Sequence, residues 1–231
     1  MRHTPMMKKI FPALAMLILL LFQTPAQAAI SEDQVRHAWR EVTRIAEMTE
    51  LPLDIKDEKI PNAWVTAGKS VTVTTGLMKL LEREEEMFGI LMHEAGHAKL
   101  GHYEGRVKNS VGVGLLAILL SEALDSTLGD VAVGVGAGLA TAGFSREQEV
   151  AADDFATDLA FKGGMDPTGL YTALERIALS GGKTQPSGFN SHPPDDRRLQ
   201  RIKNRILERD PDIVFPEVKK AEKEDDKKEE N

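Results

Sequence analysis

The chain of 231 residues contains no cysteine, and this absence excludes several kinds of site at once. Disulfide frameworks, thiolate zinc sites, iron–sulfur clusters, cysteine nucleophiles and lipid-modified N-terminal cysteines all require that side chain. Basic residues are the minority, with 29 lysines and arginines against 36 acids, so the net charge of −7 gives no electrostatic support for nucleic-acid binding. The length suits a single domain with its own core. With only six histidines, position matters more than number.

Long hydrophobic runs are also missing. The first run, residues 10–22, is shorter than the roughly 20 apolar residues of a membrane-spanning helix. Three cations in residues 2–9 precede it, and the small-x-small sequence Ala26-Gln27-Ala28 follows it, which is typical of a cleaved secretory signal peptide over residues 1–28. The alternative is an uncleaved membrane anchor. Loss of the three cations changes the net charge from −7 to −10, and we expect an exported, acidic, periplasmic protein.

Two further apolar runs, residues 111–120 and 131–144, are likewise too short to span a bilayer. One interpretation is a pair of close-packed core helices, because the second run is rich in glycine and alanine. The other is a hairpin over residues 111–144 that makes peripheral contact with a membrane surface.

The rest of the chain divides into one domain and a tail. Residues 29–215 carry the hydrophobic patterning of a folded domain. Residues 216–231 consist mostly of lysine, glutamate and aspartate and cannot bury enough surface to fold, so we expect a disordered charged tail.

Hydrophobic periodicity and capping residues predict an α+β fold that is mostly helical. The expected helices cover residues 32–50, 76–81, 84–103, 145–163, 166–181 and 194–209. The expected strands cover residues 51–56, 62–66 and 70–75, and the last two form a hairpin around Ala67-Gly68-Lys69. The basic side chains of the last helix are interpreted mainly as a solvated face.

The strongest chemical motif is His93-Glu94-Ala95-Gly96-His97, inside the helix expected over residues 84–103. Residues four apart lie on the same face of a helix, so His93 and His97 can bind one zinc ion, and Glu94 can reach a water on that ion. The alternative is a pair of surface histidines. The preceding turn is strongly apolar, however, and unpaired imidazoles entering from a buried helix are costly.

A catalytic zinc ion needs a third protein ligand. One known pattern requires histidine at position 103, where this chain has tyrosine. His102 is off register and is interpreted as a structural residue or one that supports a ligand. The other option is Glu149, which shares a helix face with Asp153, a residue placed to accept a hydrogen bond from a ligand imidazole. Taken alone, a charged first helical turn explains Glu149 more simply.

Taken together, the motifs resemble the HtpX-like gluzincin metallopeptidases, in particular the small periplasmic members of that family. The matching stretches occur in the family's order with similar gaps. They are Asn62-Ala63-Trp64, Thr75-Gly76-Leu77, His93 to His97, Ser145 to Glu149 with Ala152-Asp153, and Ser191-His192-Pro193-Pro194 with Arg198. The resemblance covers most of residues 60–200, although the chain lacks the cysteine of lipid-anchored members.

This resemblance implies a minigluzincin-type fold with a small antiparallel sheet over the active-site helix. It implies a zinc-dependent endopeptidase that holds one Zn²⁺ per chain on His93, His97 and Glu149, with Glu94 as the catalytic base. Unfolded or misfolded envelope polypeptides are the expected substrates, in protein quality control. The rivals are a non-catalytic, zinc-stabilised chaperone or adaptor and a membrane-embedded protease.

Two more residues carry open interpretations. His192 precedes two prolines that stiffen its segment. It is either a helix-capping residue or, as the resemblance implies, a fourth zinc ligand that keeps the resting enzyme latent. Arg198 matches a family arginine and is expected to hold this segment or the bound peptide.

The substrate backbone is expected to pair with an exposed edge strand, a mode that tolerates many sequences. The residues of that strand are Ala63, Trp64, Val65 and Thr66.

Overall fold

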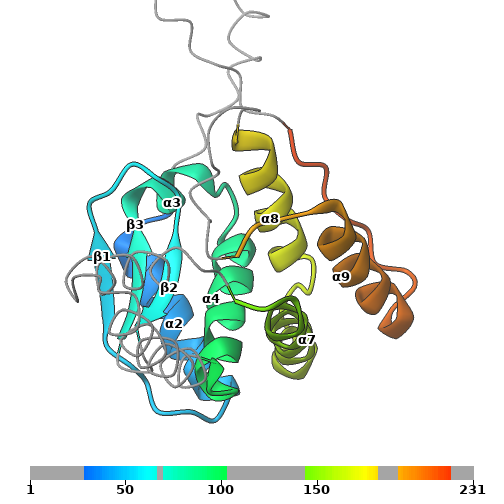
Figure 1. Ribbon diagram of the computed structural model, residues 1–231, viewed down its shortest axis with the longest axis horizontal. Helices are drawn as coiled ribbons and strands as arrows, with labels where there is room; N and C mark the ends of the chain where they lie inside the picture. The colour runs from blue at the N-terminus through cyan, green and yellow to red at the C-terminus, as the bar shows by residue number, and fades with distance from the viewer. Residues whose placement is uncertain (1–28, 67–69, 103–143, 182–191, 220–231) are drawn as a thin grey trace, which may run out of the picture.

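A computed structural model of the chain describes residues 29–66, 70–102, 144–181 and 192–219 (Figure 1). Several sequence-based expectations concern residues outside these ranges. They are the signal peptide over 1–28, the hairpin tip at 67–69, residues 111–143 of the apolar stretch, and residues 220–231 of the charged tail. Among the residues that are described, no helix combines the length and the apolar character needed to cross a membrane.

The described elements confirm the mostly helical α+β class. The helices are α2 (Glu32–Ile45), α3 (Thr75–Leu80), α4 (Glu84–Lys99), α7 (Arg146–Gly163), α8 (Gly169–Ser180) and α9 (Asp196–Arg209). The strands are β1 (Leu53–Lys56), β2 (Ala63–Thr66) and β3 (Ser70–Thr74).

Two helices end earlier than the periodicity predicts. Helix α2 stops at Ile45 rather than residue 50, and Glu47 then takes a left-handed conformation with φ 52°. Helix α4 stops at Lys99 rather than residue 103, and Gly101 has φ 66°. A residue in the left-handed conformation turns the chain away from the helix axis, and the spacing of apolar residues cannot predict where that turn occurs.

The capping box predicted at Ser145 is present and fixes the start of α7. The Gln148 amide N–H donates to Ser145 Oγ at 3.3 Å, and Gln148 Oε1 accepts from the Ser145 N–H at 3.0 Å. The helix ends at Gly163, and the next residue, Gly164, caps it with a φ of 64° that suits glycine. The cap places Glu149 in the first turn of α7, at the end that meets α4.

The sheet is mixed, not antiparallel as expected. Strands β2 and β3 form the predicted hairpin, with Ala63 opposite Val73. Strand β1 pairs with the other side of β3 in parallel, with Leu53 opposite Val71, so the order is β1-β3-β2. After β1 the chain crosses to the far edge of β3 before it forms β2, and β1 and β3 therefore run in the same direction. Strand β2 lies at one edge of the sheet.

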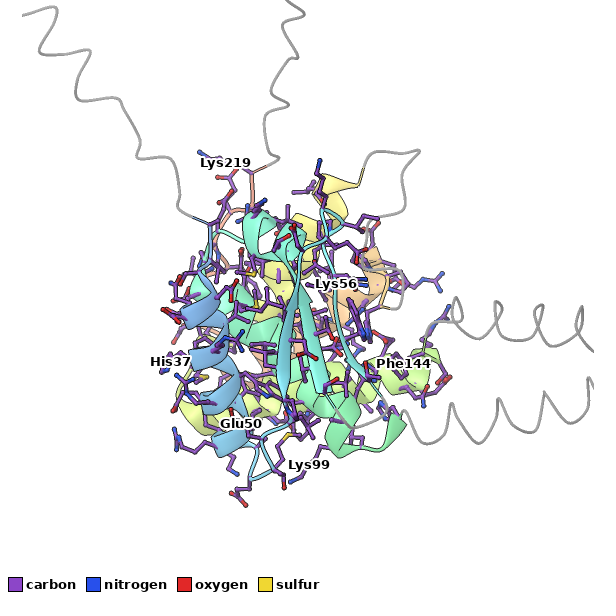
Figure 2. The ribbon with its side chains drawn as sticks, turned by 90° about the vertical axis from the view of Figure 1, so that its left-hand side faces the viewer. His37, Glu50, Lys56, Lys99, Phe144 and Lys219 are labelled. Carbon is purple, nitrogen blue, oxygen red and sulfur yellow. The ribbon has the colours of Figure 1, made fainter. Side chains whose placement is uncertain are left out.

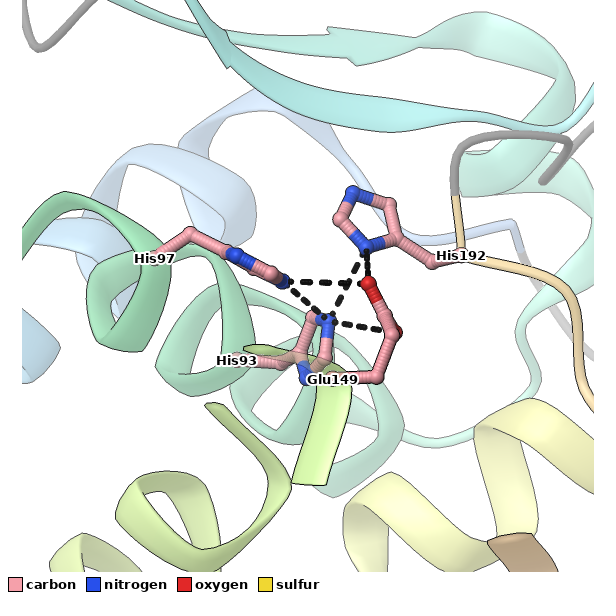
Figure 3. Close-up of side chains that lie close together, drawn as sticks. All are labelled: His93, His97, Glu149 and His192. Carbon is pink, nitrogen blue, oxygen red and sulfur yellow. Dashed lines mark hydrogen bonds and ion pairs between the residues drawn. The ribbon is translucent and has the colours of Figure 1, made fainter. Parts of the chain in front are cut away.

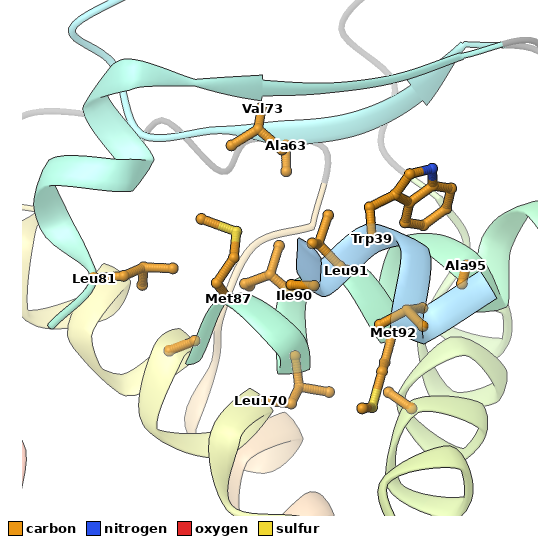
Figure 4. Close-up of a cluster of buried hydrophobic side chains, with 14 of the residues drawn as sticks. Trp39, Ala63, Val73, Leu81, Met87, Ile90, Leu91, Met92, Ala95 and Leu170 are labelled. Carbon is orange, nitrogen blue, oxygen red and sulfur yellow. The ribbon is translucent and has the colours of Figure 1, made fainter. Parts of the chain in front are cut away.

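Helix α4 is the centre of the fold. It packs against α2, α7, α8 and strand β2, with the sheet on one side and α7 and α8 on the other (Figure 1). Eleven of its 16 residues are buried, so its His93–His97 stretch has almost no solvent face. Its apolar contacts are drawn in Figure 4: Trp39 from α2, Ala63 and Val73 from the sheet, and Leu170 from α8 surround Met87, Ile90 and Leu91.

The backbones of α4 and α8 touch at two glycines. A Cβ added to Gly89 would overlap the backbone nitrogen of Leu170, and one added to Gly169 would overlap the carbonyl oxygen of Glu85. Because both obstacles are backbone atoms, the two helices must separate to admit a methyl group. We expect Gly89→Ala to lower the free energy of unfolding by about 3 kcal/mol in urea denaturation.

Gly163→Ala is the matched control for that substitution. There the nearest atom is Cδ1 of Ile45 at 2.8 Å, the end of a side chain that can turn away. Its effect on the unfolding free energy should stay below about 1 kcal/mol, since alanine also favours the helix. Equal losses in the two variants would contradict the close backbone contact of α4 with α8.

Candidate metal centre

Four predicted site residues meet at one point. His93 and His97 extend from α4, Glu149 from the first turn of α7, and His192 from the segment before α9 (Figure 3). All four are buried, and one ligand atom from each lies within 4.8 Å of the others. The chain therefore brings together residues up to 99 positions apart.

The spacing of these atoms suits a tetrahedral zinc ion. His93 Nε2 lies 3.1 Å from His97 Nε2 and 3.2 Å from His192 Nδ1. Glu149 Oε1 lies 3.4 Å from His97 Nε2 and 2.7 Å from His192 Nδ1. Bonds of about 2.05 Å at tetrahedral angles place ligand atoms roughly 3.3 Å apart, near most of these values. Three imidazoles and one carboxylate form a nitrogen and oxygen donor set that fits zinc.

The imidazoles are held in the neutral form that binds a metal. Burial lowers the pKa of His93 to about 3 and also lowers the pKa of His97 and His192. His93 Nδ1 lies 3.0 Å from Asp153 Oδ1, so its Nδ1–H donates to that carboxylate and its Nε2 lone pair faces the cluster. His97 Nδ1 lies 2.9 Å from His102 Nδ1. His102 therefore contacts a candidate ligand, in agreement with the interpretation that it supports one.

Arg198 connects three parts of the centre. It is buried and donates to both carboxylate oxygens of Asp153, at 2.8 and 3.0 Å. It also pairs with Glu149 Oε2 at 2.8 Å and donates to the His192 carbonyl oxygen at 2.9 Å. Burial favours a raised pKa for Asp153, but the charge of Arg198 and the hydrogen bonds from His93 and Arg198 together outweigh it and lower that pKa to about 2. Arg198 therefore keeps Asp153 ionised and holds the His192 segment.

The carboxylate of Glu149 is held ionised as well. Burial opposes ionisation, but hydrogen bonds with His192 and His97 outweigh it and hold the pKa of Glu149 well below its usual range. An anionic Glu149 adds the negative charge that a divalent cation needs from a ligand set otherwise made of neutral rings.

Glu94 lies beside the cluster and faces the sheet. Its side chain is fully buried, and its Oε1 lies 3.4 Å from His192 Nε2. Burial raises the pKa of Glu94 to about 8, and a backbone hydrogen bond from Val65 of β2 opposes part of that rise. One carboxyl group thus contacts both His192 of the candidate metal cluster and the edge strand.

The predicted substrate strand, β2, alternates in burial. Ala63 and Val65 are buried, Trp64 is half-buried and Thr66 is exposed. Within the described ranges β2 has a strand partner on one side only, so its other edge faces away from the sheet.

Phe144 is a site residue that sequence reasoning missed. Its ring centroid lies 3.9 Å from that of His97, and it stacks on His192 at 5.0 Å with 22° between the planes. Figure 2 labels it at the start of α7, on the opposite side of the view from His37 of α2. The sequence showed only the last residue of an apolar run and gave no signal for this contact.

The basic face of α9 is another difference from the sequence interpretation. Arg201 pairs with Asp154 at 2.6 Å, while Arg205 and Arg209 pair with Asp158 at 2.7 and 2.6 Å. This face is an ion-pair ladder to α7, not a mainly solvated surface. The spacing of four residues in both helices was a signal for it, because acids and bases with equal repeats can align across two packed helices.

Comparisons with known proteins agree with the geometry. The sequence profile of Peptidase family M48 matches residues 29–206. The chain is 39% identical to the metalloprotease YcaL and 31% identical to the metalloprotease LoiP, both of Escherichia coli K12, with each alignment covering 63% of this chain and 58% of the relative. A protease HtpX homologue of Listeria monocytogenes is 25% identical over 78% of this chain and 77% of its own length.

The chain therefore spans less than two thirds of the length of YcaL and LoiP. The resemblance to HtpX-like metallopeptidases, first seen in scattered motifs, is confirmed over most of the described domain. With residues 29–206 matched and a buried cluster that fits zinc, the chain belongs to peptidase family M48.

Proposed function

We propose that the chain is a zinc endopeptidase that hydrolyses internal bonds of extended polypeptides. The single observation that carries this proposal is the position of Glu94. It is buried beside the His93, His97 and Glu149 cluster and bonded to the backbone of β2. A purely structural zinc site has no use for a carboxyl group placed between the metal ligands and an edge strand.

The residues divide the chemistry between them. Zinc held by His93, His97 and Glu149 would supply Lewis acidity, which lowers the pKa of a coordinated water and polarises the peptide carbonyl. Glu94 accepts the proton of the attacking water on a carboxylate oxygen and delivers it to the leaving amine. The position of Glu94 supports this double role, because its buried carboxyl group lies 3.4 Å from His192 and is bonded to the backbone of Val65 in β2.

The substrate is proposed to lie along β2 as an added strand. The backbone groups of the outer edge, from Ala63 to Thr66, pair with an extended chain regardless of its sequence. Folded proteins rarely offer such a chain, so unfolded polypeptides are the substrate class. Together with the signal-peptide pattern of residues 1–28, this supports export and quality control of misfolded periplasmic proteins.

Digestion of unfolded casein tests the activity directly. We expect cleavage at internal bonds by the purified chain, loss of at least about 10³-fold in rate with a zinc chelator, and recovery when zinc is added back. Zinc content measured on the same samples should follow the rate. Zinc-dependent protection of casein from aggregation, with no cleavage, would support the chaperone or adaptor function and overturn the peptidase.

His192 is proposed to act as a regulatory fourth ligand. A zinc ion with four protein ligands has no open position for water, so the resting enzyme would be latent until this segment moves. Support comes from His192 Nδ1, which lies 3.2 Å from His93 Nε2 and 2.7 Å from Glu149 Oε1.

His192→Ala should therefore raise basal casein cleavage several-fold when zinc is in excess. Zinc affinity should fall at the same time, because one ligand is lost. Both quantities are measurable in one chelator titration that follows proteolysis and free zinc. Unchanged proteolysis together with unchanged zinc affinity would exclude the latent state.

A further inference from the structure

A cavity of about 360 Å³ adjoins the metal centre on the side of α7 and α9. Four of its lining residues also belong to the centre: Glu149 as a proposed ligand, Asp153 and Arg198 through their contacts with the cluster, and Phe144 through its stack on His192. A group seated in this cavity therefore lies next to the proposed site of peptide hydrolysis. Nothing in the reaction described so far uses it.

The cavity combines an apolar wall with a cationic rim. Phe144, Val150 and Pro193 supply the wall. Four arginines supply the rim, but two of them are already neutralised: Arg198 by Asp153 and Arg201 by Asp154.

The other two arginines have no acid within ion-pair distance among the described residues. Arg146 and Arg197 are exposed, and neither guanidinium forms an ion pair or a side-chain hydrogen bond within the part of the chain that the structure describes. The acids of the lining are engaged elsewhere. Glu149 belongs to the cluster, Asp153 pairs with Arg198, and Asp195 accepts the backbone N–H of Arg198 as the cap of α9.

Two helix dipoles add to the positive field. Helix α7, of 18 residues, and helix α9, of 14 residues, both begin at this cavity, with Arg146 and Arg197 in their first turns. The N-terminal end of a helix carries a partial positive charge that favours anions. Asp195 already offsets the α9 end, so the α7 end and the two arginines are what favour negative charge at this place.

We propose that this cavity binds an acidic side chain of the polypeptide substrate, next to the bond that is cleaved. The inference rests on the proposed function, since an extended chain on β2 is what brings a side chain here. The apolar wall packs against the methylene groups of a glutamate, and Arg146 and Arg197 bind its carboxylate.

Terminally blocked peptides of alternating threonine and serine with one central Glu, Gln or Lys test the proposal. Cleavage is followed with a fluorophore and quencher at the two ends. We expect kcat/KM for the Glu peptide to exceed that for the Gln peptide by about tenfold, because hydrogen bonds to a charged group are stronger, with Lys poorest. The preference should weaken at high salt, since the rim is exposed.

The double variant Arg146→Gln/Arg197→Gln should reduce the ratio of Glu to Gln cleavage to about one. Arg40→Gln, which changes an exposed arginine of α2 outside this cavity, is the matched control and should keep the wild-type ratio. Equal cleavage of the Glu and Gln peptides by the wild type, or an unchanged ratio in the double variant, would overturn the proposal and leave the peptidase function intact.

A binding measurement tests the acid-selective cavity separately from the proposed peptidase function. Fluorescence anisotropy of the same labelled peptides is measured on the zinc-loaded chain with Glu94→Gln. Tighter binding of the Glu peptide, lost in the added Arg146→Gln/Arg197→Gln background, would support the acid-selective cavity even if the wild type cleaved no peptide. Binding that ignores the central residue would reject the cavity whatever the casein assay shows.

Discussion

Replacing Glu94 by glutamine is expected to reduce kcat/KM for unfolded casein by at least about 10³-fold, with zinc content unchanged. Glutamine keeps the size of the side chain and can keep its contact with the backbone of Val65. It cannot accept the proton of the attacking water. The loss should therefore appear in kcat, because the proposed metal ligands and the edge strand proposed to bind substrate are unaltered.

The measurement pairs casein hydrolysis with metal analysis and thermal unfolding of the same preparation. Glu85→Gln is the matched control: it makes the same change at an exposed position in the first turn of the same helix. Its activity should equal that of the wild type. A Glu94→Gln protein that retained its zinc and more than about a tenth of the activity would exclude Glu94 as the base.

Arg176→Met is expected to lower the free energy of unfolding by about 3–5 kcal/mol. Arg176 of α8 donates to both oxygens of Glu86, at 3.1 to 3.2 Å, and the Glu86 carboxylate is fully buried in α4. The same carboxylate accepts the backbone N–H groups of Glu82 and Arg83 at the start of that helix. Without Arg176, no cation among the described residues lies within ion-pair distance of the buried Glu86 carboxylate.

Urea denaturation measures the loss, and a double variant tests its cause. Glu86→Gln/Arg176→Met removes the charge together with its partner and should recover at least half of the lost stability. Arg44→Met breaks the exposed pair with Glu41 and should leave the unfolding midpoint unchanged. A loss in Arg176→Met no larger than in Arg44→Met would contradict a stabilising buried pair.

The sequence predicted the elements of this fold better than their arrangement. The histidine helix was predictable because the motif and the apolar residues before it occupy one continuous stretch. The direction of β1 was not, since parallel pairing with β3 depends on the path of the connection after Lys56. Local patterns of alternation are the same in parallel and antiparallel strands that are half buried.

The site residues also divide into those that a local pattern predicts and those that it does not. His93 and His97 follow from helical spacing alone, whereas Glu149 needed the family resemblance, since a first-turn glutamate is common. The buried pair of Glu86 and Arg176 was missed because the two residues lie 90 positions apart. A single ion pair between two helices depends on packing that no local pattern encodes, unlike the repeated acids and bases that align α7 with α9.

The two edges of the small sheet differ in how they resist aggregation. Strand β1 carries exposed charges at Asp54 and Lys56, a device that discourages edge-to-edge pairing between copies. Strand β2 contains no charged residue between Ala63 and Thr66. Among the described residues no element covers the outer edge of β2, and an edge suited to extended chains of any sequence also suits the same strand of another copy. We therefore expect β2 to limit solubility at high concentration and a bound peptide to relieve that limit.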